Sequence, residues 1–150
     1  IRLSSAVYSS TSVASIGVAA HEAGHAVQYA IGYAPIKLRA AIIPLTQFGS
    51  MAAMPLLILG LILNTSTLVT IGIAAFGLST LFQLVTLPVE FNASARAVRL
   101  LDSTGILRGE EVGYTKQVLG AAALTYVAAA AGSILQLLRL IILFGGRRDD

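Results

Sequence analysis

The feature that most constrains the fold is an uncharged, strongly apolar stretch from Ala40 to Leu63. At a helical rise of about 1.5 Å per residue, it is long enough to cross a hydrocarbon core of about 30 Å. Similar stretches follow at residues 68–87 and 118–144. Inside hydrocarbon, only helices and closed barrels satisfy the hydrogen bonds of the backbone. We therefore predict a mainly α fold, a helical membrane protein with about three transmembrane helices.

The composition agrees with a single membrane domain over residues 1–150. Of the 150 residues, 56% are hydrophobic and only 11% are charged, and the mean hydropathy is +0.82. The absence of cysteine excludes disulfides and a cysteine zinc cluster, so a metal site must use histidine and carboxylate ligands. The net charge of +3 comes without a long basic stripe or interleaved aromatic residues, so we expect no nucleic-acid partner.

The first two spans are joined by a short polar turn, Asn64–Thr67, and therefore form a hairpin. Residues before Ala40 and after Leu87 must then lie on the same side of the membrane. Basic residues are concentrated on that side, whereas Arg147 and Arg148 lie opposite, so the positive-inside rule predicts that it faces the cytoplasm. The basic residues of that side are Lys37, Arg39, Arg96, Arg99, Arg108 and Lys116.

The pentapeptide His21-Glu22-Ala23-Gly24-His25 precedes the first span, within a predicted helix from about Ser12 to Ala30. Residues four apart share one helical face, so both imidazoles point the same way and Glu22 stands beside them. His21 and His25 can each give a nitrogen to zinc, with Glu22 as general base on zinc-bound water. The alternative is two ordinary histidines on a core or surface helix. These are the only histidines in the chain, and their spacing around a glutamate favours the metal site.

Catalytic zinc usually has three protein ligands, so this site needs one more. No third histidine exists, and among the acids on the same membrane face Glu90 is the best candidate. It follows Pro88, which suits the first turn of a new helix over residues 88–105, where the second span ends. The alternative for Glu90 is a favourable charge in the first turn of that helix. Weaker ligand candidates lie in an expected flexible connection: Asp102, Glu110 and Glu111.

The amino-terminal residues Ile1–Tyr8 alternate like an edge strand, and the chain has no initiator methionine. We expect a remnant edge strand here, from a sheet that begins upstream of this chain. A peptide substrate would add to that edge by backbone hydrogen bonds. An alternative is that this chain is a fragment that is inactive because its amino-terminal region is lost, although its parent enzyme is active.

Two segments carry the most specific motifs, Ala19-Ala20-His21-Glu22-Ala23-Gly24-His25-Ala26-Val27-Gln28 and Pro88-Val89-Glu90-Phe91-Asn92-Ala93-Ser94-Ala95-Arg96-Ala97. They resemble the bacterial neutral zinc metallopeptidases of the YugP-like family, and the resemblance covers essentially the whole chain. It implies a membrane-bound gluzincin of the bacterial cytoplasmic membrane, with Zn²⁺ held by His21, His25 and Glu90. It also implies an amino-terminal membrane helix and soluble segment that this chain lacks.

One position departs from the broader gluzincin pattern. Four residues after the glutamate ligand that pattern commonly has an aspartate, which hydrogen-bonds the first histidine, and here the position is Ser94. A neutral hydroxyl should hold His21 less firmly than a carboxylate would. The group that would stabilise an oxyanion is left open among four candidates: Arg96, Tyr8, Tyr29 and Tyr114.

These features predict a zinc-dependent endopeptidase that hydrolyses peptide bonds at the cytoplasmic membrane face. Its partners would be the lipid bilayer and a polypeptide or membrane-protein substrate, and oligomerisation is left open. The alternative from another class is a catalytically silent zinc-binding membrane scaffold or partner-binding protein. A small transporter is a weaker alternative, because the spans show no paired intramembrane charge and no broken-helix repeat.

Overall fold

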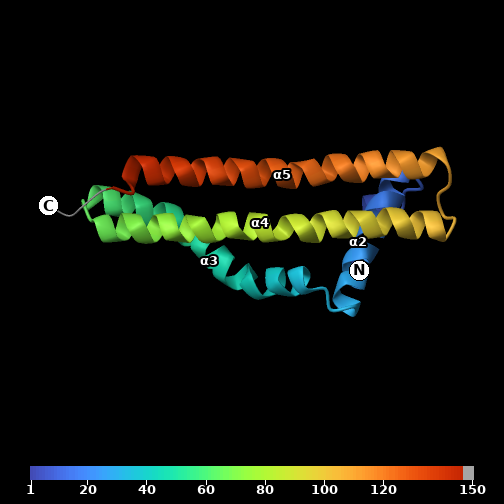
Figure 1. Ribbon diagram of the computed structural model, residues 1–150, viewed down its shortest axis with the longest axis horizontal. Coiled ribbons are helices and arrows are strands. Elements are labelled where there is room, and N and C mark those ends of the chain that lie inside the picture. Colours follow the sequence, from blue (N-terminus) through green and yellow to red (C-terminus); the bar gives the residue numbers. More distant parts are fainter. Residues whose placement is uncertain (147–150) are drawn as a thin grey trace. The chain divides into compact units, whose positions relative to one another are not determined.

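The computed structural model describes residues 1–146, and within them the chain is helical (Figure 1). Its helices are α1 (Ser5–Tyr8), α2 (Val13–Ala30), α3 (Ala34–Ile62), α4 (Ser66–Ser103) and α5 (Glu110–Phe144). No strand occurs among residues 1–146, and the predicted mainly α class is confirmed. The tail residues used in the argument on sidedness, Arg147 and Arg148, lie outside the described residues.

Two compact units make up the fold. The first consists of Ile1–Lys37 and Thr86–Val127, and the second consists of Leu38–Val85 and the chain from Ala128 onward. The long helices α4 and α5 each contribute residues to both units. The HExxH sequence and Glu90 belong to the first unit, so the candidate site lies within one unit.

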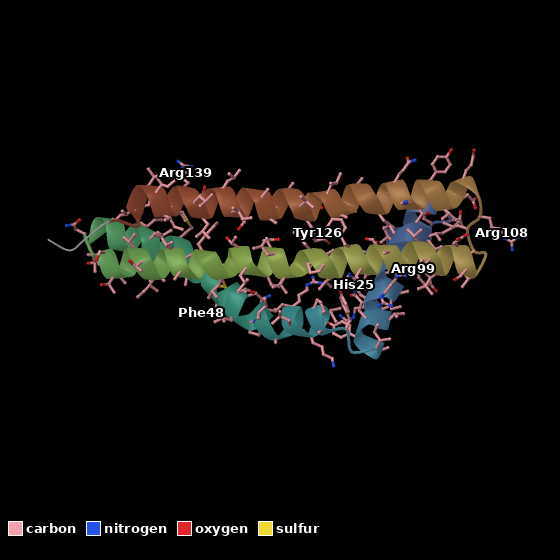
Figure 2. All side chains as sticks on the ribbon, in the orientation of Figure 1. His25, Phe48, Arg99, Arg108, Tyr126 and Arg139 are labelled. Carbon is pink, nitrogen blue, oxygen red and sulfur yellow. The ribbon has the colours of Figure 1, made fainter. Side chains whose placement is uncertain are left out.

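Helices α3, α4 and α5 are long and apolar enough to cross a membrane. Their most apolar windows have mean hydropathies of 1.7, 2.0 and 2.1, yet only 28%, 17% and 11% of those windows are buried inside the protein. Large apolar side chains are exposed instead, such as Phe48, which is 73% exposed on α3 (Figure 2). Apolar surface on this scale indicates contact with lipid rather than with water, so the chain is a membrane protein.

The predicted edge strand at Ile1–Tyr8 is wrong. Ser5–Tyr8 form α1, a single turn of helix whose N-cap is Ser4; its Oγ accepts a hydrogen bond from the Val7 amide at 3.3 Å. The Tyr8 amide donates to the Ser4 carbonyl at 2.9 Å. An edge strand needs a neighbouring strand, and without one a helical turn satisfies the backbone locally. Substrate binding by strand addition at this segment therefore loses its basis.

Residues 68–87 and 88–105 were expected as a span and a separate helix, but through Ser103 they lie in one uninterrupted helix, α4. Pro88 lies inside α4, where it removes one intrahelical hydrogen bond; transmembrane helices tolerate this when neighbouring groups support the backbone. Similarly, α5 begins at Glu110, so part of the expected flexible connection is helical. Glu110 and Glu111 lie in its first turn, where negative charge is favourable.

The second unit contains the hairpin of α3 and α4 and packs mainly on apolar contacts. Leu57, Val69 and Leu140 form its buried cluster. At Gly72 the two helices of the hairpin come very close, because a Cβ there would lie 2.8 Å from Leu57 Cγ and 3.1 Å from the Ala53 carbonyl oxygen. Glycine therefore serves close helix packing in this unit.

Candidate metal centre

Helix α2 carries the HExxH sequence and agrees closely with the predicted helix of residues 12–30. Its N-cap is Ser12, whose Oγ accepts a hydrogen bond from the Ser15 amide at 3.2 Å. This serine side chain satisfies a backbone N–H that has no partner within the helix. The helix places His21 and His25 about one turn apart on a common face.

Helices α2 and α4 meet at Gly24, in the middle of the HExxH sequence. A Cβ at Gly24 would lie 2.6 Å from the Ala93 carbonyl oxygen, which is closer than real Cβ atoms come. The facing side of α4 is completely buried at Val89, Ala93 and Ala97. Because glycine and alanine occupy the contact, the two backbones approach closely, and side chains next to them can converge.

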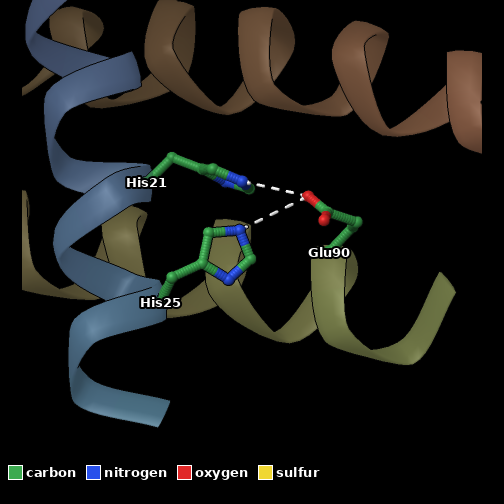
Figure 3. Close-up of side chains that lie close together, drawn as sticks. All are labelled: His21, His25 and Glu90. Carbon is green, nitrogen blue, oxygen red and sulfur yellow. Dashed lines mark hydrogen bonds and ion pairs between the residues drawn. The ribbon is translucent and has the colours of Figure 1, made fainter. Parts of the chain in front are cut away.

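Three donor atoms converge at this contact (Figure 3). His21 Nε2 lies 3.1 Å from Glu90 Oε2, and His25 Nε2 lies 3.5 Å from the same oxygen. All three ligand atoms lie within 4.8 Å of one another. A tetrahedral zinc ion at about 2.0–2.2 Å from each ligand would separate its donors by roughly 3.3–3.6 Å. Two imidazoles and one carboxylate are also a ligand set that catalytic zinc uses, so these residues fit a zinc ion.

Glu90 changes the acid–base chemistry of the centre. The hydrogen bond with Glu90 raises the pKa of His25 above its usual value of 6.5, against the opposing effect of burial. A hydrogen bond with Gln28 and the negative charges of Glu90 and Glu22 raise this pKa further. The carboxylates around the imidazoles thus favour a positive charge here, and a bound cation would supply one.

Each histidine is also held through its second ring nitrogen. His21 Nδ1 lies 3.1 Å from Ser94 Oγ, one helical turn beyond Glu90 on α4. His25 Nδ1 donates a hydrogen bond to Gln28 Oε1 at 2.9 Å. With both Nδ1 atoms engaged in this way, both Nε2 atoms face Glu90. This is the orientation that ligation through Nε2 requires.

Several residues that were predicted from the sequence lie together in the structure. His21, His25, Glu90 and Ser94 are in direct contact, and Glu22 is partly buried on α2, near enough for its charge to act on His25. The three-residue cluster found among residues 1–146 has Glu90 as its acid. It does not include the weaker ligand candidates: Asp102, Glu110 and Glu111.

The candidates for oxyanion stabilisation are largely exposed or make hydrogen bonds outside the cluster of His21, His25 and Glu90. Tyr8, Tyr29 and Tyr114 are exposed by 80%, 58% and 53%. Arg96 is partly buried, and its Nε donates a hydrogen bond to Asn92 Oδ1 at 2.8 Å. Arg96 is thereby connected, through Asn92 and Gln28, to Nδ1 of His25, the ring nitrogen that does not face Glu90.

Gln28 and Asn92 were not predicted as site residues. Gln28 is 0% exposed, and its amide contacts His25 on one side and Asn92 on the other. A signal was present in the sequence, because Gln28 follows His25 by three residues and residues at that spacing are neighbours on a helix. No comparable local signal connects Asn92 to the centre.

Known proteins are similar to this chain over its whole length. The chain is 45% identical over 150 residues to "Putative membrane protease YugP" of Bacillus subtilis (strain 168); the alignment covers 100% of this chain and 67% of that protein. No solved structure matches the chain. Residues 1–145 match the family described as "Putative neutral zinc metallopeptidase", which implies Zn²⁺ as the cofactor. The chain therefore belongs to this family of neutral zinc metallopeptidases.

Proposed function

We propose that this protein is a zinc-dependent membrane endopeptidase of the gluzincin type, acting on polypeptide or membrane-protein substrates. The observation that carries the proposal is the convergence of His21, His25 and Glu90, whose donor atoms all lie within 4.8 Å of one another. The family match and the printed name of the Bacillus subtilis relative, a membrane protease, support the same activity.

His21, His25 and Glu90 would hold the metal. When bound, zinc supplies a Lewis acid that polarises the scissile carbonyl and lowers the pKa of water. Glu22 accepts a proton from the attacking water, whose oxygen forms a bond to the carbonyl carbon. As the C–N bond breaks, Glu22 returns that proton to the leaving amine nitrogen. The carboxylate of Glu22 is thereby regenerated at the end of each turnover.

Ser94 would support His21 in this mechanism without adding a negative charge. Its hydroxyl lies 3.1 Å from His21 Nδ1, at the position where gluzincins commonly have an aspartate. A hydroxyl orients the ring by a hydrogen bond but raises the basicity of the imidazole less than a carboxylate does. Glu90 and Glu22 are therefore the carboxylates that the proposal assigns to this centre.

We further propose that the protein is a multi-pass protein of the bacterial cytoplasmic membrane, with the centre on the cytoplasmic side. The hairpin of α3 and α4 supports this topology, because it puts the residues before α3 and the end of α4 on one side. An excess of basic residues there supports the cytoplasmic assignment. They are Lys37, Arg39, Arg96, Arg99, Arg108 and Lys116.

The test is zinc content and peptidase turnover of the purified protein in detergent, with an unfolded membrane protein as substrate. The unaltered protein should bind stoichiometric zinc and cleave the substrate. His21→Ala should lose the zinc. Glu22→Gln should retain the zinc but lose turnover by about 10²–10⁴-fold, the usual contribution of general acid–base catalysis.

Glu110→Gln is the matched control, because it makes the same chemical change in an acid of the first turn of α5 that is not in the metal cluster. It should change neither zinc content nor turnover. An unaltered protein without bound zinc, or a Glu22→Gln variant that cleaves at the normal rate, contradicts the proposal. Zinc binding without cleavage by the unaltered protein would identify a zinc-binding scaffold instead.

A further inference from the structure

The two histidines of the centre have different partners on Nδ1. His21 Nδ1 contacts the hydroxyl of Ser94, which can either donate or accept a hydrogen bond. His25 Nδ1 contacts the side-chain oxygen of Gln28, which can only accept. Glu90 Oε2 also accepts, but it lies 3.5 Å from His25 Nε2, whereas Gln28 Oε1 lies 2.9 Å from Nδ1. The shorter contact favours the proton of neutral His25 on Nδ1, whereas the contact with Ser94 favours neither nitrogen of His21.

The orientation of the Gln28 amide is determined by two further contacts. Its Nε2 donates to the Val89 carbonyl at 2.8 Å and to Asn92 Oδ1 at 3.1 Å. Reversing the amide would place its oxygen against the Val89 carbonyl oxygen, a contact between two acceptors. Gln28 is also 0% exposed, so water does not offer it other partners. Its oxygen is therefore directed at His25.

Arg96 fixes the orientation of Asn92 in turn. Arg96 Nε donates to Asn92 Oδ1 at 2.8 Å, and a guanidinium has no acceptor atom. Asn92 must therefore present its oxygen, and the same oxygen accepts the hydrogen bond from Gln28 Nε2. A connected series of hydrogen bonds thus runs from Arg96 through Asn92 and Gln28 to His25, and the donor-only guanidinium determines the direction of each amide.

We infer that Gln28, Asn92 and Arg96 are positioning residues that keep His25 in the tautomer protonated at Nδ1. In this tautomer Nε2 carries the lone pair, and Nε2 is the atom that faces Glu90 at 3.5 Å. The consequence for zinc rests on the proposed function, since it requires that His25 is a ligand. Groups that orient a metal-binding histidine typically change metal affinity by about 10–100-fold.

The tautomer can be measured directly because the chain has only two histidines. We would record the ¹⁵N chemical shifts of both imidazoles in the metal-free protein in detergent, at a pH above the titration of His25. His21→Ala assigns the two sets of signals. In the unaltered protein, His25 should be protonated at Nδ1. In Gln28→Met and in Asn92→Leu, it should shift to a mixture of both tautomers.

Zinc affinity gives the second measurement, by competition with a chelator of known affinity. Gln28→Met and Asn92→Leu preserve side-chain size and should bind zinc about 10–100-fold more weakly. Asn92→Asp keeps an oxygen acceptor for Gln28 and Arg96. Its zinc affinity should therefore stay within roughly a few-fold of that of the unaltered protein. Gln83→Met is the control, a glutamine in the part of α4 that belongs to the second unit.

An unchanged His25 tautomer in Gln28→Met and Asn92→Leu overturns the inference, as do equal zinc affinities of Asn92→Leu and Asn92→Asp. If the buried Gln28→Met variant does not fold, the two Asn92 variants decide, because Asn92 is only partly buried. Failure of the proposed function looks different. In that case the unaltered protein binds no zinc, while the tautomer measurements on the metal-free protein still decide whether the positioning residues act on His25.

Discussion

The two units use the same packing device for different purposes. In the first unit Gly24 brings α2 against the Ala93 carbonyl of α4, and in the second unit Gly72 brings α4 against Leu57 of α3. Beside Gly24 the helices bury a network of hydrogen-bonded polar side chains, including Gln28 and Glu90. Beside Gly72 they bury an apolar cluster. Close helix contact therefore occurs in both units. The network of amide and carboxylate side chains lies in the unit that carries the candidate centre, whereas the second unit has smaller polar contacts such as that of Thr80 with Ser133.

The difference teaches where substitutions should be most costly. A buried polar group that loses its partner retains the full cost of its desolvation, whereas a lost apolar contact can be partly regained by repacking. In a bilayer, lipid chains also replace apolar contacts at little cost. We therefore expect variants of the polar network in the first unit to alter zinc binding strongly, and variants of the packing in the second unit to alter mainly stability.

The largest effect should come from Glu90→Gln. This change keeps the size of the side chain but removes the charge that both histidines face at 3.1 and 3.5 Å. Zinc affinity should fall by more than the roughly 10–100-fold expected for groups that only orient a ligand. Measurement of zinc by competition titration checks this. Tight zinc binding by Glu90→Gln would show that Glu90 is not a ligand.

The next largest effect should come from Gly24→Ala. Its methyl group would lie 2.6 Å from the Ala93 carbonyl oxygen, so α2 and α4 must separate. We expect a net loss of about 1–2 kcal/mol in unfolding free energy, because an overlap with rigid backbone costs up to about 3 kcal/mol and alanine regains about 1 kcal/mol at a helical position. Zinc affinity should fall as well, because the same displacement moves both histidines away from Glu90.

Gly113→Ala serves as the control for Gly24→Ala. Gly113 lies in α5 of the same unit, and a Cβ there would have nothing within 4 Å. This variant should be neutral or slightly more stable in thermal unfolding in detergent. If both alanine variants behave alike, the close contact of α2 and α4 at Gly24 is wrong.

A smaller effect is expected from pH. Because hydrogen bonding to Glu90 raises the pKa of His25, protons should compete with zinc from above the usual value of 6.5. Below that raised pKa, zinc affinity should fall by up to about tenfold per pH unit, since binding must release the proton. The stability of the metal-free protein should depend on pH in the opposite direction to zinc affinity. The stabilisation from charged His25 is present at low pH and is lost as pH rises through the raised pKa.

Proton NMR titration of the metal-free protein measures this pKa, with His21→Ala for assignment. Glu90→Gln is the control, because it removes the largest cause of the shift and should bring the pKa of His25 back toward its usual value. A titration of His25 at or below 6.5 in the unaltered protein would contradict the expected competition.

The smallest effect should come from the second unit, in Thr80→Val. Thr80 Oγ1 lies 2.8 Å from Ser133 Oγ, a hydroxyl pair between α4 and α5 within that unit. Hydrogen bonds between transmembrane helices contribute about 0.6 kcal/mol on average. Thermal unfolding in detergent should show a loss of about this size, and zinc affinity should not change. A large loss of zinc binding would break the contrast between the two units.

The sequence predicted most of the helical structure because the relevant patterns are local. Long uncharged stretches such as Ala40–Leu63 can only satisfy their backbone groups as helices in a membrane protein. Ser12 was identifiable as the start of α2 because a capping serine acts within one turn. The hairpin topology predicted that Glu90 lies on the same side of the membrane as the histidines. Its contacts with both histidines agree with this prediction.

The errors and omissions concern information that is not local. The alternation of Ile1–Tyr8 fits a strand, but a strand depends on a partner, and α1 forms instead. Pro88 was interpreted as the start of a helix, because proline is usually excluded from helix interiors, yet α4 continues through it. The contact of Gln28 with Asn92 depends on side-chain conformations at a helix crossing, which spacing along the chain does not specify.

The continuity of α4 has a mechanical consequence. The apolar residues of α4 and the carboxylate of Glu90 belong to one helix, without a loop in which a displacement could be absorbed. Transmembrane helices tilt to match the thickness of the surrounding bilayer. Pro88 lies two residues before Glu90 and removes a backbone hydrogen bond of α4. If α4 bends when it tilts, Pro88 is therefore the expected position of the bend. Lipid chain length is therefore expected to act on the geometry of the proposed metal ligands, alongside pH and zinc concentration.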